Sequence, residues 1–388
     1  MKAHIVVGAN FGDEGKGQIT QFLCHQNSNK IVVRHNGGAQ AAHTVVDKKG
    51  TRFVFHHFGS GTNLGVPTYL SEYFICNPKV FEEEFENLRI MGIPTPEVYI
   101  NTNSLLSIPY DWLLNRSAEN TKGHNRLGSC GLGINETVTR CTHEEYKTVV
   151  QDLFDIQGLK NKIQRIVREY LPERVSKLNL EISDFENLSM DRFIQDCVRM
   201  LHKILTVEKT TILLNKFDNL IFEGAQGLLL DEDHKYYPHV TRSKTGSGNA
   251  FKILENTNCT DVDVYYVTRT YLTRHGAGPL PNEMNLGSLI NDVTNTPNAY
   301  QGHLRVAPLN LDLMLEAIEL DLQEQPLDYN ININCAVTWY NNNPFNGEWI
   351  EDKRTYHGDI LQKLKNMFAD KVFAFSTPFS HISPLELI

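Results

Sequence analysis

Residues 3–23 read AHIVVGANFGDEGKGQITQFL, and this stretch decides the fold. A short run rich in Val and Ile ends abruptly in a polar, Gly-rich loop, and apolar residues resume at Ile19. A short apolar run of this kind is typical of a strand buried on both faces. A Gly-rich loop between a strand and a helix presents backbone N–H groups to phosphate oxygens. The stretch therefore predicts a strand, a P-loop-like phosphate-binding loop and a helix.

The loop departs from the usual pattern G-x-x-x-x-G-K-[ST] at two positions. Asn10 stands at the first Gly, and Gly17 stands where a Ser or Thr hydroxyl would hold Mg²⁺. The neighbouring carboxylate of Asp13 is then the natural oxygen ligand for Mg²⁺, while Lys16 can meet phosphate oxygens. The alternative interpretation is a Gly-rich turn that carries a surface acid and a surface lysine.

Other parts of the chain repeat the pattern of a Val- and Ile-rich run followed by a polar loop. These runs are residues 31–34, 220–222, 262–268, 331–337 and 372–375. In an open parallel sheet, the loops at the carboxyl ends of the strands converge at one edge, where ligands bind. We therefore expect an α/β fold with a central, mostly parallel sheet flanked by helices.

The pattern changes between about residues 144 and 214. Apolar side chains recur there at helical spacing, namely Phe193, Ile194, Cys197, Val198, Leu201 and Leu205. We therefore expect a helical insertion within a single domain that spans residues 1–388. Residues 45–58 predict a β-hairpin instead, because the polar, Gly-ended turn at 47–50 separates two β-rich runs.

The composition is that of an ordinary globular protein. The 388 residues include 41% hydrophobic and 21% charged side chains, which excludes a collagenous or wholly disordered chain. A formal net charge of −9 argues against a nucleic-acid-binding function. Because no apolar run approaches the roughly 20 residues of a membrane span and no signal-peptide profile is visible, we expect a cytoplasmic protein without membrane contact. The seven scattered cysteines argue against a disulfide framework or a structural zinc site.

A series of motifs resembles the adenylosuccinate synthetase family, in order and at similar spacing. The motifs are residues 12–17, 37–44, 222–231, 237–241, 273–279 and 302–312, and the resemblance covers essentially the whole chain. It implies a ligase that joins L-aspartate to C6 of a 6-oxopurine nucleoside monophosphate. In that reaction an NTP, with Mg²⁺, turns the 6-oxygen into a phosphate leaving group, and IMP gives adenylosuccinate.

The resemblance implies a chemical role for four residues. Asp13 would take the N1 proton, and Lys16 would neutralise charge on the phosphates. His43 would donate to the transferring phosphoryl group or the 6-oxygen, and Gln226 would hold that oxygen. Asp13 and the backbone carbonyl of Ala42 would bind Mg²⁺. Without the resemblance, a single histidine such as His43 is more often structural than catalytic.

Further residues are expected around the nucleotides and aspartate. The nucleotide-binding residues are Gly12, Glu14, Gly15, Gly17, Gln40, Ala42, Thr44, Ser129, Cys130, Arg140, Thr241, Trp339 and Ser376. Three of these, Ser129, Cys130 and Thr241, would surround the 5′-phosphate. Arg140 would reach a nucleotide phosphate across a homodimer interface, or it is a solvated arginine on a loop. The aspartate-binding residues are Asn298, Gly302, His303 and Arg305, of which Arg305 would clamp the carboxylates.

The chain departs from the family where the family binds its nucleotides. This chain has Gln40 where the family has Asn, Ala42 where it has Gly, and Cys130 where it has Thr. It has His303 where the family has a loop Arg. The T-K-x-D motif through which cellular members recognise guanine is absent, because the corresponding strand continues as residues 334–340, NCAVTWY. ATP could then replace GTP, with Trp339 stacking on either base, unless Trp339 packs in the core.

These departures leave the substrates open. The loss of the guanine motif and the segment 301–305 are similar to the phage branch of the family, which makes a 2-aminoadenine precursor from dGMP. That branch replaces the catalytic Asp by Ser, so the retained Asp13 favours IMP. We expect IMP as the substrate, with dGMP or GMP and ATP or dATP as the alternative. Two other classes stay open: a non-catalytic nucleotide-binding regulator and a generic P-loop NTPase.

Overall fold

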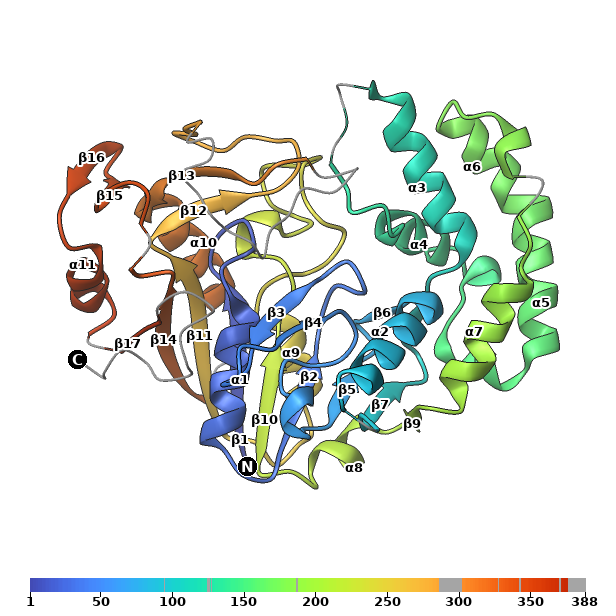
Figure 1. The fold of residues 1–388 in the computed structure, drawn as a ribbon, viewed down its shortest axis with the longest axis horizontal. Coiled ribbons are helices and arrows are strands. Elements are labelled where there is room, and N and C mark those ends of the chain that lie inside the picture. The colour runs from blue at the N-terminus through green and yellow to red at the C-terminus, as the bar shows by residue number, and fades with distance from the viewer. Residues whose placement is uncertain are drawn as a thin grey trace.

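The computed structural model describes residues 1–375, except 94, 124–125, 127, 186–187, 286–301, 327, 342 and 370. A large parallel sheet organises this part of the chain (Figure 1). Its strands are β1 (Lys2–Gly8), β2 (Lys30–Arg34), β5 (Thr68–Leu70), β7 (Val98–Asn101), β9 (Leu205–Val207), β10 (Asn219–Glu223), β11 (Asp261–Arg269), β14 (Asn330–Thr338) and β17 (Val372–Ala374). Their order is β17-β14-β11-β1-β10-β2-β5-β7-β9, and each neighbouring pair is parallel. The α/β fold predicted from the sequence is confirmed.

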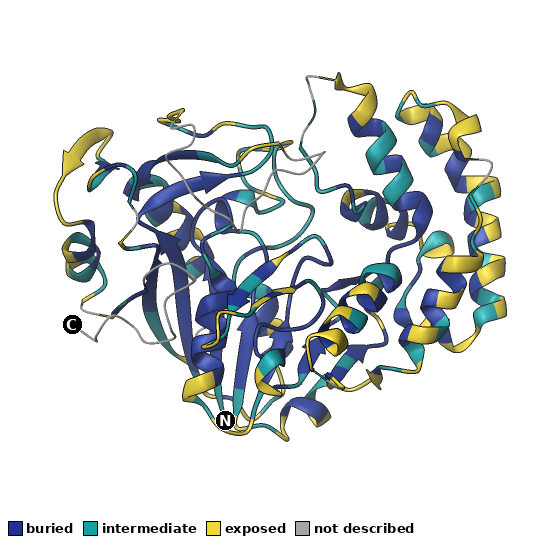
Figure 2. Cartoon of the chain, viewed as in Figure 1, coloured by how far each residue is buried: buried dark blue, intermediate teal, exposed yellow. Residues whose placement is uncertain are grey.

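Helices cover both faces of the sheet. They are α1 (Lys16–Gln26), α2 (Pro78–Ile90), α8 (Thr210–Leu214), α9 (Gly248–Leu254), α10 (Leu311–Gln323) and α11 (Ile360–Met367). Because successive side chains of a strand point to opposite faces, Ile5 and Val7 of β1 pack in one apolar cluster with α9 and α10. Val6 packs in another cluster with Ile19 and Phe22 of α1. The central strands are therefore buried on both sides, as Figure 2 shows.

A helical lobe lies beside the sheet, at the right of Figure 1. It consists of α3 (Pro109–Thr121), α4 (Ile134–Cys141), α5 (Ile156–Arg165), α6 (Leu171–Lys177) and α7 (Asp191–Leu201), with a π-helical turn, Ile166–Tyr170, between α5 and α6. As the spacing predicts, α7 buries Phe193, Ile194 and Cys197. Two helices of the lobe, α3 and α4, precede residues 144–214, and the bounds expected for the insertion stay a prediction. Leu205 does not continue the helix: it lies in β9, which pairs with β7 at the edge of the sheet.

Smaller sheets complete the fold. The predicted hairpin is present as β3 (His43–Val46) and β4 (Arg52–Phe55), with Val45 opposite Phe53. A short pair joins β6 (Ile75–Cys76) to β8 (Leu105–Leu106), and a mixed sheet contains β12 (Tyr271–Arg274), β13 (Arg305–Asn310), β15 (Glu348–Glu351) and β16 (Arg354–His357). No helix in the described ranges is long and apolar enough to cross a membrane.

A buried ion pair joins α3 to α4 and corrects the prediction for Arg140. The guanidinium donates to Asp111 from Nε at 2.9 Å and from Nη2 at 2.7 Å, and Nη1 donates to the carbonyl of Tyr146 at 2.6 Å. Both charged side chains are almost fully buried. Arg140 is therefore neither a solvated arginine nor a group free to reach the nucleotide of a partner subunit. The homodimer, which rested on this residue, stays a prediction.

Replacing Arg140 by Ala is expected to lower the free energy of unfolding by about 3–5 kcal/mol, because Asp111 is left buried without its counter-charge. Chemical denaturation of the variant and the wild type measures this loss. Arg168→Ala is the matched control, because Arg168 pairs with Glu169 at the surface and its removal should leave the midpoint unchanged. Wild-type stability together with weakened nucleotide binding in Arg140→Ala would restore the role predicted from the sequence.

Candidate functional site

The carboxyl ends of neighbouring strands open into one cavity of about 700 Å³. Asp13, Gln40, Gln226, Arg269 and Trp339 line it, and they follow or end β1, β2, β10, β11 and β14. The cavity thus lies at the edge of a parallel sheet where α/β proteins bind ligands. Its far wall belongs to the helical lobe, from which α3, α4 and α6 contribute lining residues.

The loop after β1 holds a buried ion pair of its own. The carboxylate of Glu14 accepts hydrogen bonds from the backbone N–H of Asn10 at 3.1 Å, the N–H of Gly12 at 2.8 Å and Lys16 Nζ at 2.8 Å. A Cβ on Gly8 would lie 2.5 Å from this carboxylate, so only glycine fits there. In this structure the Glu14 carboxylate accepts from backbone N–H groups that were expected to bind phosphate. It also forms an ion pair with Lys16.

Asp13 lines the cavity from a loop that two hydrogen bonds hold in place. Its backbone carbonyl accepts from Arg269 Nε at 2.7 Å, and the carbonyl of Gly12 accepts from Thr273 Oγ1 at 2.8 Å. The residue adopts the left-handed conformation, with φ 62°, a strained geometry that is common at functional sites. The Asp13 carboxylate also lies 3.5 Å from Nε2 of His275, which the sequence analysis did not single out.

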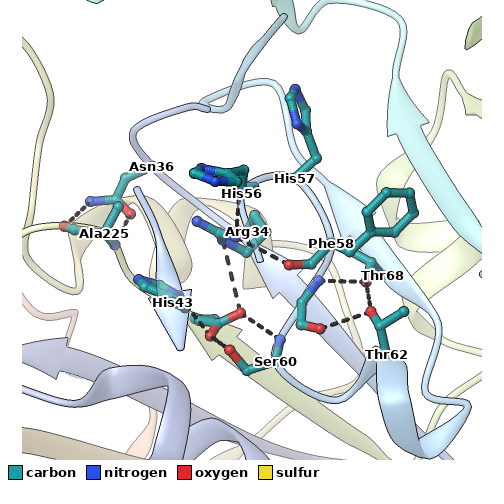
Figure 3. A network of polar contacts seen from close by, with 12 residues as sticks. Arg34, Asn36, His43, His56, His57, Phe58, Ser60, Thr62, Thr68 and Ala225 are labelled. Atoms are coloured by element: carbon teal, nitrogen blue, oxygen red, sulfur yellow. Dashed lines mark hydrogen bonds and ion pairs between the residues drawn. The ribbon is translucent and has the colours of Figure 1, made fainter. Parts of the chain in front are cut away.

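A buried carboxylate supports His43 (Figure 3). His43 Nδ1 lies 2.8 Å from Glu223 Oε1, and the backbone N–H of Ser60 donates to Glu223 Oε2 at 3.0 Å. The Ser60 hydroxyl donates to the same carboxylate, and Arg34 Nε lies 4.0 Å away. Because an ionised carboxylate only accepts, Nδ1 must carry a proton, and Nε2 is the ring nitrogen left for a ligand.

Opposing effects set the charges of this pair. Burial alone would raise the pKa of Glu223, but the hydrogen bond and charge of His43, together with Arg34, lower it to about 2. Burial lowers the pKa of His43, and Glu223 opposes that shift. Glu223 is therefore ionised at neutral pH. Glu223, Ser60 and Arg34 are not among the site residues predicted from the sequence, although Glu223 directly precedes the predicted Gln226 loop.

Most of the site residues predicted from the sequence line the same cavity. They are Gly12, Asp13, Gly15, Lys16, Gly17, Gln40, Ala42, His43, Thr44, Ser129, Cys130, Gln226, Thr241 and Trp339. Amide atoms of Gln40 and Gln226 are buried without hydrogen-bond partners among the described residues. Because buried polar groups are normally paired, these atoms indicate a ligand that binds here.

Other predicted residues lie elsewhere. Arg305 donates from Nε to Glu283 at 2.9 Å and from Nη1 to the carbonyl of Gly276 at 2.9 Å, and it does not line the cavity. Gly302 and His303 are exposed and also lie apart from it. Trp339 is only 4% exposed and packs with Tyr271 and Phe345, so its ring serves the core as well as the cavity wall. Asn298 and Ser376 fall outside the described residues.

The residues present fit a magnesium ion held mainly by substrate. Among the described residues, no group of three or more His, Cys, Asp and Glu side chains is placed to hold a metal alone. Mg²⁺ is commonly bound by one or two carboxylates plus substrate phosphates. Asp13, which is partly exposed, lines the cavity and offers one carboxylate. Ala42, which is exposed, lines it too and carries the carbonyl predicted as the second ligand.

These features define a class, the P-loop-like α/β proteins that bind nucleotides at the carboxyl edge of a parallel sheet. Sequence comparison defines the family. A model of the adenylosuccinate synthetase family matches residues 5–313, and the chain belongs to this family. The resemblance seen in the motifs is confirmed at this level.

Curated relatives agree with that assignment. The adenylosuccinate synthetases of Nostoc punctiforme and Gloeothece citriformis are 33% and 34% identical to the chain, over 74% of the chain and 64% of each relative. The match thus spans slightly less than two thirds of these relatives.

Solved structures share the fold. Fully ligated adenylosuccinate synthetase from Plasmodium falciparum has a TM-score of 0.65 at 22% identity, covering 86% of this chain and 76% of its own. Succinoaminodeoxyadenylate synthetase of cyanophage S-2L, bound to dGMP and dATP, has a TM-score of 0.60 at 15% identity, covering 99% and 94%.

Glu223→Gln is expected to lower the free energy of unfolding at neutral pH by on the order of 3 kcal/mol, because folding depresses the carboxyl pKa to about 2. A carboxyl with a depressed folded pKa contributes stability above its ordinary pKa and loses it as the pH falls toward the folded value. The gap between wild type and variant should be widest above about pH 4.5 and should narrow toward pH 2. Denaturant titrations at stepped pH measure it, and a constant gap would contradict an ionised carboxylate.

Proposed function

We propose that the protein is a ligase that joins L-aspartate to C6 of a 6-oxopurine nucleoside monophosphate, with IMP preferred, through a 6-phosphoryl intermediate formed from an NTP. One observation carries this proposal: Asp13, Gln226 and His43, the last supported by Glu223, line a single cavity. An acid, an amide and an imidazole on one cavity suit proton removal from N1 and phosphoryl transfer to the exocyclic 6-oxygen of a purine.

Asp13 acts as the base toward N1–H of the purine. The ring N–H is a weak acid and an ordinary carboxylate is a weak base, and each unit of pKa mismatch costs about 1.4 kcal/mol. Because Glu14 already neutralises Lys16, the lysine lends less charge to the developing oxyanion than the sequence alone suggests. Mg²⁺, held by the Asp13 carboxylate and substrate phosphates, would supply further positive charge. Gln226, whose amide oxygen has no partner in the described structure, lines the same cavity, and its NH₂ group would donate to the 6-oxygen.

His43 acts toward the phosphoryl group. Its Nδ1 is committed to Glu223, so Nε2 donates only when the ring carries both protons. A phosphoryl group beside Nε2 adds negative charge and favours that protonated form. The 6-oxygen then attacks the γ-phosphorus while the bond to the bridging oxygen breaks, and positioning and charge neutralisation carry the transfer.

The nucleotide pair is the finer part of the proposal. Retained Asp13 favours IMP, and the lack of the guanine-recognition motif favours ATP or another non-guanine donor, although GTP stays open. The alternative is a phage-type reaction of dGMP or GMP, and the cyanophage neighbour, bound to dGMP and dATP, supports it at the level of a shared fold. Aspartate binding by Arg305 requires that the guanidinium leave Glu283.

A substrate matrix tests the proposal. Purified protein with aspartate and Mg²⁺ is incubated with IMP, GMP or dGMP against GTP, ATP or dATP, and the succinylated product is measured. We expect product from IMP with at least one donor. Product only from dGMP or GMP would establish the phage-type alternative. Phosphate release independent of aspartate would indicate an NTPase, and no reaction in any combination would favour a regulator.

Asp13→Asn should fold normally and lose turnover by at least about 10²- to 10⁴-fold, because the contact that Arg269 makes with this residue uses its backbone carbonyl and not its carboxylate. Formation of 6-phosphoryl product in a single turnover measures the loss, and circular dichroism checks the fold. Asp184→Asn is the control, since Asp184 is exposed in the helical lobe and should leave turnover unchanged. Near-normal turnover of Asp13→Asn would remove the base from the mechanism.

A further inference from the structure

The 5′-phosphate of a nucleoside monophosphate needs a positive charge that the expected residues do not provide. A phosphate monoester carries about −1.5 to −2 charges at neutral pH and is bound best by charged donors. Arg140 is committed to Asp111 inside the helical lobe. Burial raises the pKa of Cys130 to about 11, so this residue offers a neutral thiol. Ser129 and Thr241 offer hydroxyl groups only.

Most cations that line the cavity are already hydrogen-bonded within the protein. They donate to protein acceptors at 3.0 Å or less, and they are Lys16, Arg174, Arg269 and Arg274. Lys122, at the end of α3, also lines the cavity and lies 3.9 Å from Glu119. Arg242 differs from the first four because its side chain donates no such hydrogen bond to the described residues, and from Lys122 because its donor Nε is buried. Its side chain is 39% exposed, its nearest ion-pair partner, Glu232, lies 4.0 Å away, and its buried Nε has no hydrogen-bond partner among the described residues.

The backbone on both sides of Arg242 is fixed. The N–H of Thr241 donates to the carbonyl of Leu230 at 2.9 Å, and the carbonyl of Ser243 accepts from the N–H of Glu232 at 3.3 Å. The hydroxyl of Ser243 accepts from the N–H of Gly37 at 3.1 Å. Arg242 is therefore presented to the cavity from an anchored segment, which reduces the entropy lost when its side chain binds a ligand.

Three segments that line the cavity contact one another, and one of them carries Arg242. A Cβ on Gly128 would lie 2.4 Å from Cα of Gly276, so the segment that leads to Ser129 packs directly on the loop after β12. Arg274, at the end of β12, donates from Nη2 to the carbonyl of His239 at 2.7 Å. The segment 237–242 is thus tied to the same loop, and all three segments line one cavity.

We propose that Arg242 binds the 5′-phosphate of the nucleoside monophosphate, together with the hydroxyl groups of Ser129 and Thr241. The planar guanidinium can donate two parallel hydrogen bonds to phosphate oxygens. It also supplies a positive charge, which Arg140 does not because it is paired with Asp111. This inference deepens the proposed function and rests on it only in that the ligand is a purine nucleoside monophosphate. It requires no turnover.

Calorimetric titration of the full chain with matched ligands tests the inference. IMP is compared with inosine, and dGMP with deoxyguanosine, on the wild type, Arg242→Gln and Arg242→Lys. We expect Arg242→Gln to weaken binding of the better nucleotide by about 10- to 100-fold and to leave binding of its nucleoside unchanged. Arg242→Lys should restore part of the nucleotide affinity, because it keeps the charge without the planar fork.

Lys235→Gln is the matched control. Lys235 carries the same charge two residues before the segment 237–242, but it pairs with Glu316 at 2.6 Å and does not line the cavity, so its loss should change neither affinity. Equal nucleotide affinity in the wild type and Arg242→Gln would overturn the inference. So would an equal loss for nucleotide and nucleoside, or a wild type that binds neither nucleotide. If no succinylated product forms while the Arg242 effect on binding persists, the ligase proposal fails and this inference stands.

Discussion

The buried carboxylate of Glu223 links four segments at the carboxyl edge of the sheet. It ends β10 and meets Arg34 at the end of β2, His43 at the start of β3 and Ser60 in the segment after β4. Taking a carboxylate out of water is costly unless charges and hydrogen bonds surround it. The network meets that requirement, and in doing so it fixes one tautomer of His43. A group needed for stability thereby determines which ring nitrogen faces the cavity.

The strands could be predicted from the sequence because helices cover both faces of the sheet. A run such as 262–268 stays apolar at nearly every position only when both faces of the sheet are covered, and this pattern needs no knowledge of partners. The loop after β1 was readable for a similar reason, since its glycines and charged residues act within a few positions of one another. Both predictions depend on local chemistry.

Contacts between distant segments escaped that reasoning. Arg140 looks like a loop arginine until Asp111, which lies 29 positions earlier, is placed against it. Glu223 and His43 are 180 positions apart, so neither residue signals the pair. Leu205 fits a helical spacing, yet pairing with β7 draws it into a strand, which is a case of tertiary contacts overriding a local pattern.

Several arginines and lysines line the cavity although the chain as a whole is acidic, and the pairing of these cations decides where an anion can bind. The chain carries a net charge of −9, so its overall field repels phosphates. Within the cavity Lys16 is neutralised by Glu14, and Arg174 is paired with Glu136 through two hydrogen bonds. Attraction must then come from oriented groups at close range: the N-terminus of α1 behind the glycine loop and the few cations not already hydrogen-bonded. Such groups act over a few ångströms, so they discriminate by position. In the proposed complex the NTP phosphates would meet the glycine loop and the single 5′-phosphate of the monophosphate would meet the segment 237–242, so the two anchors together would fix the purine ring beside Asp13.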